Sequence, residues 1–253
     1  MPPETLLLLV GAGVAAGLSG SMAGLASLFS YPALLAVGLP ATAANVTNTV
    51  SLAFSALGAA AGSRPELAGQ AATVGRCALI AVPGGATGAG LLLVTPPGTF
   101  EVIVPVLVAA AALVLLAQPV IARHLARRAA TVGRPGWGVL AGVLAVSVYG
   151  GYFGAAAGVL MLALIMVGLP VTLLQGNALK TVLLGLANTV AAVGFAVFGP
   201  VQWWAVPPMA AGLLVGAWCG PWLARRLPTT VLRTGIALAG LGLAVALALQ
   251  SWT

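Results

Sequence analysis

Polar side chains interrupt a long apolar run at residues 175–190, QGNALKTVLLGLANTV. Among them is Lys180, the only lysine in the chain. An ammonium group inside a hydrocarbon layer costs at least about 2.5 to 3.5 kcal/mol, and it usually faces a partner or a water-filled cavity. Lys180 therefore needs a partner, and a negatively charged ligand is one that would match its charge.

The composition places this run in a membrane. The chain is 61% apolar and 5% charged, with a mean hydropathy of +1.13, and so few charges cannot cover the surface of a soluble protein. The cations are Lys180 and nine arginines in short connecting segments, which leaves no broad basic face for nucleic acid. We predict an all-α integral membrane protein, with one membrane domain over 1–253 that contacts lipid and no nucleic acid.

Eight apolar segments are expected to form the membrane helices. Six have the length of one span, since about 20 residues cross a hydrocarbon core of about 30 Å. The other two are longer and glycine-rich in the middle, with GLSGSMAG at 17–24 and GGYFGAAAG at 150–158. Each glycine lowers helix stability by about 1 kcal/mol relative to alanine, so we predict a break in both. The segments run over 5–38, 41–62, 71–95, 101–122, 136–168, 171–198, 204–224 and 229–249.

The two long segments belong to a tandem repeat with an offset of 130 residues. The corresponding features are Gly20 and Gly150, Gly24 and Gly154, and the VGLP tetrapeptides at 37–40 and 167–170. The next helix repeats with a shift of one residue, so that TNTVS at 47–51 lies opposite GNALK at 176–180. We expect repeats near 1–122 and 136–253, joined by a cytoplasmic linker over 123–135. Internal repeats of this kind mark transporter folds.

The arginines predict how the repeats are oriented, because short cytoplasmic loops are rich in Arg and Lys. If every apolar segment crosses the membrane once, six arginines fall on one side and three on the other. If each long segment doubles back as a hairpin, all nine fall on one side. This parity predicts two inverted repeats, each with a broken or re-entrant glycine-rich helical hairpin plus three transmembrane helices. The arginine-rich loops are then cytoplasmic, and both termini lie on the outer side.

Lys180 and the two breaks define the expected binding site. Counting from Pro170 at 1.5 Å per residue puts Lys180 about 15 Å deep, where Glu4, Glu66 and Glu101 cannot reach it. Half-helices that stop at a break expose N–H groups and the positive end of a dipole, which bind oxyanions. The residues expected to bind substrate are Lys180, Asn177, Gln175, Asn45, Thr47, Asn48, Ser51, Gly24, Gly154 and Tyr152.

Other interpretations of these residues stay open. Lys180 could bond to helix-end carbonyls, could be buried without its charge, or could belong to a helix that starts elsewhere. The glycines could serve close helix packing alone, as small residues do in membranes.

The residue types do not favour catalysis, because an intramembrane enzyme needs acids, histidines or an activated nucleophile within the membrane. The only histidine, His124, is surrounded by arginines at a membrane edge. Cys77 and Cys219 match no metal-ligand spacing. We therefore predict that the protein is not an enzyme and uses no metal or other cofactor.

Both halves resemble a known family. The glycine-rich segments ending in GLP are followed by ANVTNTVSLAFSALGAAAG at 44–62 and QGNALKTVLLGLANTVAAVGF at 175–195, and GAWCGPWLARRLPTTVLR at 216–233 precedes the last segment. These stretches are similar to the sulfite exporter TauE/SafE family of membrane permeases over nearly the whole chain. The resemblance implies movement of sulfite, sulfonates and related sulfur-containing or organic anions across the bacterial inner membrane, commonly outward. The family's Gly-x-Gly-Gly-Gly pattern is reduced here to GLASL at 24–28 and GAAAG at 154–158.

The sequence thus predicts an inner-membrane permease that exports a small anion bound between two inverted repeats. Two other functions share the same features: a channel or facilitator for anions or small solutes, and an accessory subunit of a membrane complex. A homo-oligomer is compatible with all three.

Overall fold

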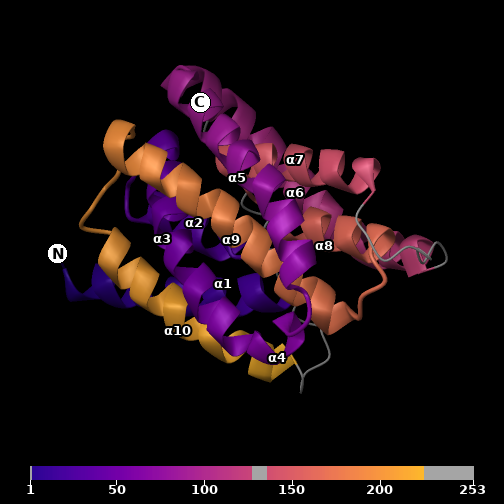
Figure 1. Ribbon diagram of the computed structural model, residues 1–253. Helices are drawn as coiled ribbons and strands as arrows, with labels where there is room; N and C mark the ends of the chain where they lie inside the picture. Colours follow the sequence, from indigo (N-terminus) through magenta and orange to yellow (C-terminus); the bar gives the residue numbers. More distant parts are fainter. Residues whose placement is uncertain (1, 127–135, 225–253) are drawn as a thin grey trace.

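The computed structural model describes residues 2–126 and 136–224 (Figure 1). These residues form ten helices and no strand, which confirms the all-α prediction for this part of the chain. The helices are α1 (Pro3–Ala23), α2 (Ser27–Ala36), α3 (Ala41–Gly62), α4 (Arg64–Leu67), α5 (Ala71–Val94), α6 (Pro97–Ala126), α7 (Trp137–Tyr152), α8 (Ala157–Gly168), α9 (Leu173–Phe198) and α10 (Val206–Ala224).

The residues at the helix ends explain where helices begin and stop. Pro3 lies in the first turn of α1, where its missing N–H is not needed. That helix stops at Gly24, which has a left-handed φ of 76°. At the start of α9, the Thr172 hydroxyl accepts from the Gln175 N–H, and the Gln175 side chain accepts from the Thr172 N–H. This capping box fixes the start of α9 at Leu173.

Both glycine-rich stretches interrupt the helical structure. The breaks span residues 24–26, between α1 and α2, and residues 153–156, between α7 and α8. Gly24 and Gly154, which correspond in the repeat, both have a φ of 76°. The helices that follow are short, at 10 residues for α2 and 12 for α8. At 1.5 Å per residue they measure about 15 and 18 Å, roughly half of a hydrocarbon core.

Three helices, α1, α5 and α9, are long and apolar enough to cross a membrane by their length and composition. Shorter apolar stretches lie in α2, α6, α7, α8 and α10. Large apolar side chains also cover much of the outer surface, including Leu57, Leu79, Val94 and Phe198. Because soluble proteins rarely expose so much apolar surface, these helices support a multi-pass membrane protein.

The helices pack in pairs that join the two halves of the chain. α1 lies along α10 and α5 lies along α7, while α9 packs against both α3 and α5. In Figure 1, α9 crosses the middle of the bundle between the α3–α10 side and the α5–α7 side. Each of these first-half helices therefore finds a main partner in the second half.

Glycines make these contacts close. A Cβ atom added at Gly84 or Gly88 on α5 would meet α7, and one added at Gly212 or Gly216 on α10 would meet the backbone of α1. Each α5 glycine precedes its α10 counterpart by 128 residues. Small residues let membrane helices approach until their backbones touch. Glycines of the two glycine-rich stretches also pack closely, since a Cβ atom at Gly17 would meet the backbone of α10 and one at Gly151 would meet the backbone of α5.

Helix α6 is longer than its predicted segment, 101–122, at both ends, because it begins at Pro97 and continues through residues 123–126. Arg123, Leu125 and Ala126 favour helix, so the end of the apolar run does not end the helix. The start of the predicted linker is thus helical, and its remainder, 127–135, lies outside the described residues. The predicted last segment, 229–249, also lies outside them.

Candidate functional site

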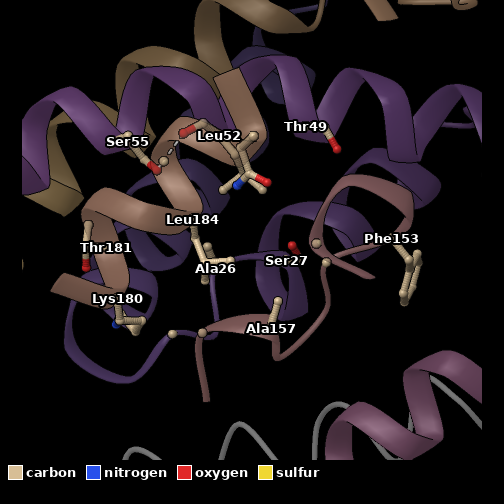
Figure 2. A pocket seen from close by; sticks show the side chains of 17 residues that line it. Ala26, Ser27, Thr49, Leu52, Ser55, Phe153, Ala157, Lys180, Thr181 and Leu184 are labelled. Carbon is tan, nitrogen blue, oxygen red and sulfur yellow. Dashed lines mark hydrogen bonds between the residues drawn. The ribbon is translucent and has the colours of Figure 1, made fainter. Parts of the chain in front are cut away.

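A cavity of about 70 Å³ lies where the two breaks meet α3 and α9 (Figure 2). This is several times the volume that one buried water needs, so the cavity can hold a small solute. Figure 2 shows Thr49, Leu52 and Ser55 along α3 on one side of it. The lining residues are Gly24, Ala26, Ser27, Thr49, Leu52, Ser55, Ala56, Gly150, Phe153, Gly154, Ala157, Gly158, Lys180, Thr181, Leu184, Gly185 and Asn188.

Helices α2 and α8 both begin at this cavity. Ser27 starts α2, and Ala157 and Gly158 start α8, and all three line the cavity. Within the described part of the chain, the backbone N–H groups of Ser27 and Gly158 donate to no acceptor. The first N–H groups of a helix lack partners within the helix, and together with the positive end of the dipole they favour an anion. Two such ends converge here.

Lys180 lines the same cavity, although its side chain is only 1% exposed. Its Nζ atom donates to the backbone oxygen of Gly20 at 3.0 Å and to Oδ1 of Asn177 at 2.7 Å. Gly20 lies in the last turn of α1, so one of these bonds is the contact with a helix-end carbonyl considered from the sequence. An ammonium group has three donors, and one of them remains for the cavity once these two bonds are made.

Two asparagines tie each half of the chain to the other half. Asn177 on α9 donates through Nδ2 to the backbone oxygen of Ser21 at 2.6 Å, at the end of α1. Asn45 on α3 donates through Nδ2 to the backbone oxygen of Tyr152 at 2.9 Å, at the end of α7. Carbonyls in the last turn of a helix have no donor within that helix. These two amides therefore stabilise the helix ends at both breaks.

The first break also touches the start of α8. A Cβ atom at Gly24 would lie 2.6 Å from backbone atoms of Gly158, and one at Gly158 would meet the Cα atom of Gly24. Because Gly24 also has a left-handed φ, two independent reasons require glycine there. The break of each half thus forms part of one shared cavity wall.

Other predicted residues make structural contacts outside the lining. The Thr47 hydroxyl accepts from the backbone N–H of Gln202 at 2.9 Å, and the Ser51 hydroxyl donates to the backbone oxygen of Thr47 at 2.9 Å. Gln175 caps α9, and the Tyr152 hydroxyl lies 3.5 Å from a threonine hydroxyl at the end of α5. Of the ten predicted site residues, the lining includes Lys180, Gly24 and Gly154.

Asn48 contacts the lining without belonging to it. Its Nδ2 donates to the Ser27 hydroxyl at 3.3 Å, and the Asn48 side chain is fully buried. This bond joins α3 to the start of α2.

Sequence reasoning missed five polar lining residues, namely Ser27, Thr49, Ser55, Thr181 and Asn188. On α9, Lys180, Leu184 and Asn188 are spaced by four residues, so they share one helix face. Following that face two turns beyond the lysine would have found Asn188. Ser27 could not be found this way, because its position depends on the path of the chain through the break.

The expected start of the helix that carries Lys180 was wrong. The count began at Pro170, but the capping box starts α9 at Leu173, so Lys180 lies about 10 Å along the helix instead of about 15 Å. The open question of where this helix starts is thereby answered.

The family model described as sulfite exporter TauE/SafE matches residues 9–247. The chain belongs to the TauE/SafE family. The resemblance drawn from the sequence is thus confirmed over nearly the whole chain. No curated protein and no solved structure matches the chain. TauE/SafE proteins are membrane transporters of sulfite and other anions and not enzymes, which agrees with the apolar helices seen here.

For a TauE/SafE transporter, the cavity offers three kinds of anion contact. The starts of α2 and α8 offer N–H groups, Lys180 offers a charged donor, and Ser27 and Thr181 bring hydroxyls. The Thr181 hydroxyl already donates to the backbone oxygen of Asn177 at 2.9 Å, so its oxygen faces the site mainly as an acceptor. The arrangement suits a small anion held mainly by backbone groups and one ammonium.

Proposed function

We propose that this protein is a permease that moves a small anion across the bacterial inner membrane, and that the anion binds in the cavity between α3, α9 and the two breaks. One observation carries this proposal. The chain's only lysine lines the cavity at which two helices begin, and it makes no ion pair with a described acidic residue. A negative solute supplies the charge that this group of donors lacks.

The substrate class comes from the family. Sulfite or a related sulfur-containing or organic anion is proposed because the chain belongs to a family described as sulfite exporters. The cavity itself favours a small oxyanion, because N–H groups at helix starts and an ammonium bind the charged oxygen atoms of an anion. These donors do not select the rest of the anion.

We also propose that the two halves are inverted repeats with re-entrant hairpins. Helix packing supports this. By the repeat, α1 corresponds to α7 and α10 corresponds to α5, and the α1–α10 pair is matched by the α7–α5 pair. A two-fold axis within the membrane would relate the two pairs in this way. The lengths of α2 and α8 support it as well, since each is about half of a span. The loop containing Arg64 then faces the cytoplasm, and the N-terminus faces outward.

Export is the proposed direction. A membrane potential of 100 mV, negative inside, contributes about 2.3 kcal/mol for each charge that leaves. That equals roughly a fifty-fold concentration ratio for a monovalent anion. A carrier can therefore expel anions without any second gradient.

Flux in proteoliposomes tests this function and separates it from its rivals. The purified protein should transport sulfite, thiosulfate, a sulfonate or a small carboxylate, with saturation and with counterflow of labelled against unlabelled anion. A channel or facilitator would show neither saturation nor counterflow. An accessory subunit would transport nothing by itself, and that outcome would refute the proposal.

A further inference from the structure

Besides Oγ1 of Thr42, two buried amide oxygen atoms on α3 have no hydrogen-bond partner among the described residues. They are Oδ1 of Asn45 and Oδ1 of Asn48. Both residues are 0% exposed, and because they are three positions apart they lie on the same face of α3. Burying a polar atom without a partner is unfavourable, and within a membrane no bulk water can replace the partner. Two such acceptors on one face indicate a ligand that offers hydrogen-bond donors or a positive charge.

The neighbour of Asn45 fixes which atom of its amide faces which way. Nδ2 of Asn45 donates to the backbone oxygen of Tyr152, and a carbonyl oxygen can only accept. The NH₂ group of Asn45 must therefore face the end of α7, which leaves its Oδ1 unpaired. Nδ2 of Asn48 donates to the Ser27 hydroxyl at 3.3 Å. Oδ1 of Asn45 is thus free beside the end of α7, and Oδ1 of Asn48 is free beside the start of α2.

In the second half of the chain, a cation occupies the corresponding position. The repeat pairs Asn48 with Asn177, Ser51 with Lys180, and Gly20 with Gly150. The Lys180 ammonium bonds to both Oδ1 of Asn177 and the backbone oxygen of Gly20. An amide oxygen and a helix-end carbonyl therefore hold a positive charge there.

The first half has the same acceptors but no ammonium. Ser51 stands at the lysine position, and its hydroxyl bonds within α3 to the backbone oxygen of Thr47. Oδ1 of Asn48 has no partner, and the backbone oxygen of Gly150 accepts no hydrogen bond within the described residues. Oδ1 of Asn177 and the backbone oxygen of Gly20 hold Lys180, and their first-half counterparts, Oδ1 of Asn48 and the backbone oxygen of Gly150, are thus both free.

We infer that a monovalent cation, Na⁺, binds beside the end of α7 to Oδ1 of Asn45, Oδ1 of Asn48 and the backbone oxygen of Gly150, as the first-half equivalent of the Lys180 ammonium. Hard cations prefer oxygen ligands, and half-helix ends together with free carbonyls hold Na⁺ in inverted-repeat transporters. The negative end of the α7 dipole favours the same charge. The ligand set contains no carboxylate, which suits one positive charge better than two.

This cation site adjoins the anion cavity. Gly150 belongs to the cavity lining, and so does Ser27, to which Asn48 donates. Each ion should therefore raise the affinity for the other, and the two effects must be equal by thermodynamic linkage. This coupling rests on the proposed function, whereas the cation site itself does not.

Binding of ²²Na⁺ to the purified full-length protein, in choline chloride and without any transported anion, tests the site. The wild type should bind ²²Na⁺ saturably, and unlabelled NaCl should displace it. Asn48→Leu should weaken binding at least about tenfold, because it removes one ligand from a site with few ligands. Asn48→Asp should strengthen it, because a carboxylate adds negative charge. Ser51→Lys should abolish it, because the new ammonium would take the place of the ion.

Ser147→Ala is the matched control. The Ser147 hydroxyl is also a buried oxygen without a partner, but it lies on the side of α7 that meets Gly84 of α5. This variant should bind ²²Na⁺ as the wild type does, and thermal unfolding shows which variants are folded. If Asn48→Leu does not fold, ²²Na⁺ binding to Asn48→Asp and Ser51→Lys tests the site instead. No saturable binding to the wild type, or equal binding to the wild type and Ser51→Lys, would overturn the inference.

The two proposals can fail separately. Saturable ²²Na⁺ binding without any anion flux would contradict the permease alone. Anion flux by a protein that binds no ²²Na⁺ would contradict the cation site alone.

Discussion

The Nζ atom of Lys180 donates a 3.0 Å hydrogen bond to the backbone oxygen of Gly20, so the only lysine in the chain joins α9 of the second half to the last turn of α1 in the first. The same side chain lines the central cavity. One residue thus joins the two halves and lines the cavity in which we propose that the anion binds. A substitution that keeps the hydrogen-bond donors but removes the charge can separate these roles.

The contact between the first break and the start of α8 predicts a strong effect at Gly24. Gly24→Ala places a Cβ atom against backbone atoms of Gly158 and also strains a left-handed residue. Gly38→Ala is the matched control, because Gly38 has a φ of 88° but open space around it. The backbone strain alone costs about 1 to 2 kcal/mol. Thermal unfolding in detergent should show a clearly larger loss for Gly24→Ala, and equal losses would mean that the contact contributes nothing.

Close packing of α5 on α7 predicts different outcomes for two glycines of one helix. Gly88→Ala should lower the thermal unfolding temperature and the yield, because its Cβ atom would meet the backbone of α7. Gly90→Ala should be neutral or slightly stabilising, since Gly90 is exposed with nothing near its Cβ position and alanine favours helix. Melting curves of the two variants provide the comparison. A Gly88→Ala protein as stable as the wild type would argue against direct backbone contact.

The free amide of Asn188 predicts an effect on transport without loss of stability. Asn188 lines the cavity, and its side chain makes no hydrogen bond within the described chain. Asn188→Leu removes no internal bond, so the unfolding temperature should not fall. The KM for the transported anion should rise up to about tenfold if the amide bonds to the solute. An unchanged KM would show that this end of the cavity does not contact the anion.

The proposed inverted topology predicts which loops face outward. In a background without Cys219, which is exposed, single cysteines would replace Pro65, Pro96 or Pro200, all exposed in the structure. A membrane-impermeant thiol reagent should label positions 96 and 200 from outside intact cells, and position 65 only after the cells are opened. The arginine pattern assigns positions 130 and 230 to the same inner face as 65. Labelling of positions 96 and 200 from opposite sides would contradict the hairpins and support one crossing for each apolar segment.

The sequence was informative where local chemistry decides structure. Glycine-rich stretches with poor helix propensity predicted both breaks, which lie at residues 24–26 and 153–156. Apolar run lengths predicted α3 and α5 to within a residue at each end. The unusual position of one lysine predicted that Lys180 would line the central cavity, and it does.

The sequence was less informative where contacts depend on the path of the chain. The repeat singled out Asn48 and Thr47 as candidates, but whether each lines the cavity or bonds to another segment depends on how α3 turns against its neighbours. Thr47 bonds to Gln202, 155 residues away, and no local pattern predicts such a contact. The capping box of Gln175 was visible in the sequence, and using it would have placed the start of α9 correctly.

Equilibrium binding of radiolabelled anion to purified Lys180→Gln and Lys180→Arg tests the central claim most directly, with the anion that shows the highest flux in the substrate panel. Glutamine keeps donors for Gly20 and Asn177 but has no charge, whereas arginine keeps both. The account predicts that Lys180→Gln folds and binds the anion at least about 100-fold more weakly, while Lys180→Arg retains much of the affinity. Wild-type affinity in a folded Lys180→Gln protein would contradict it, because the lysine would then serve only to join the two halves.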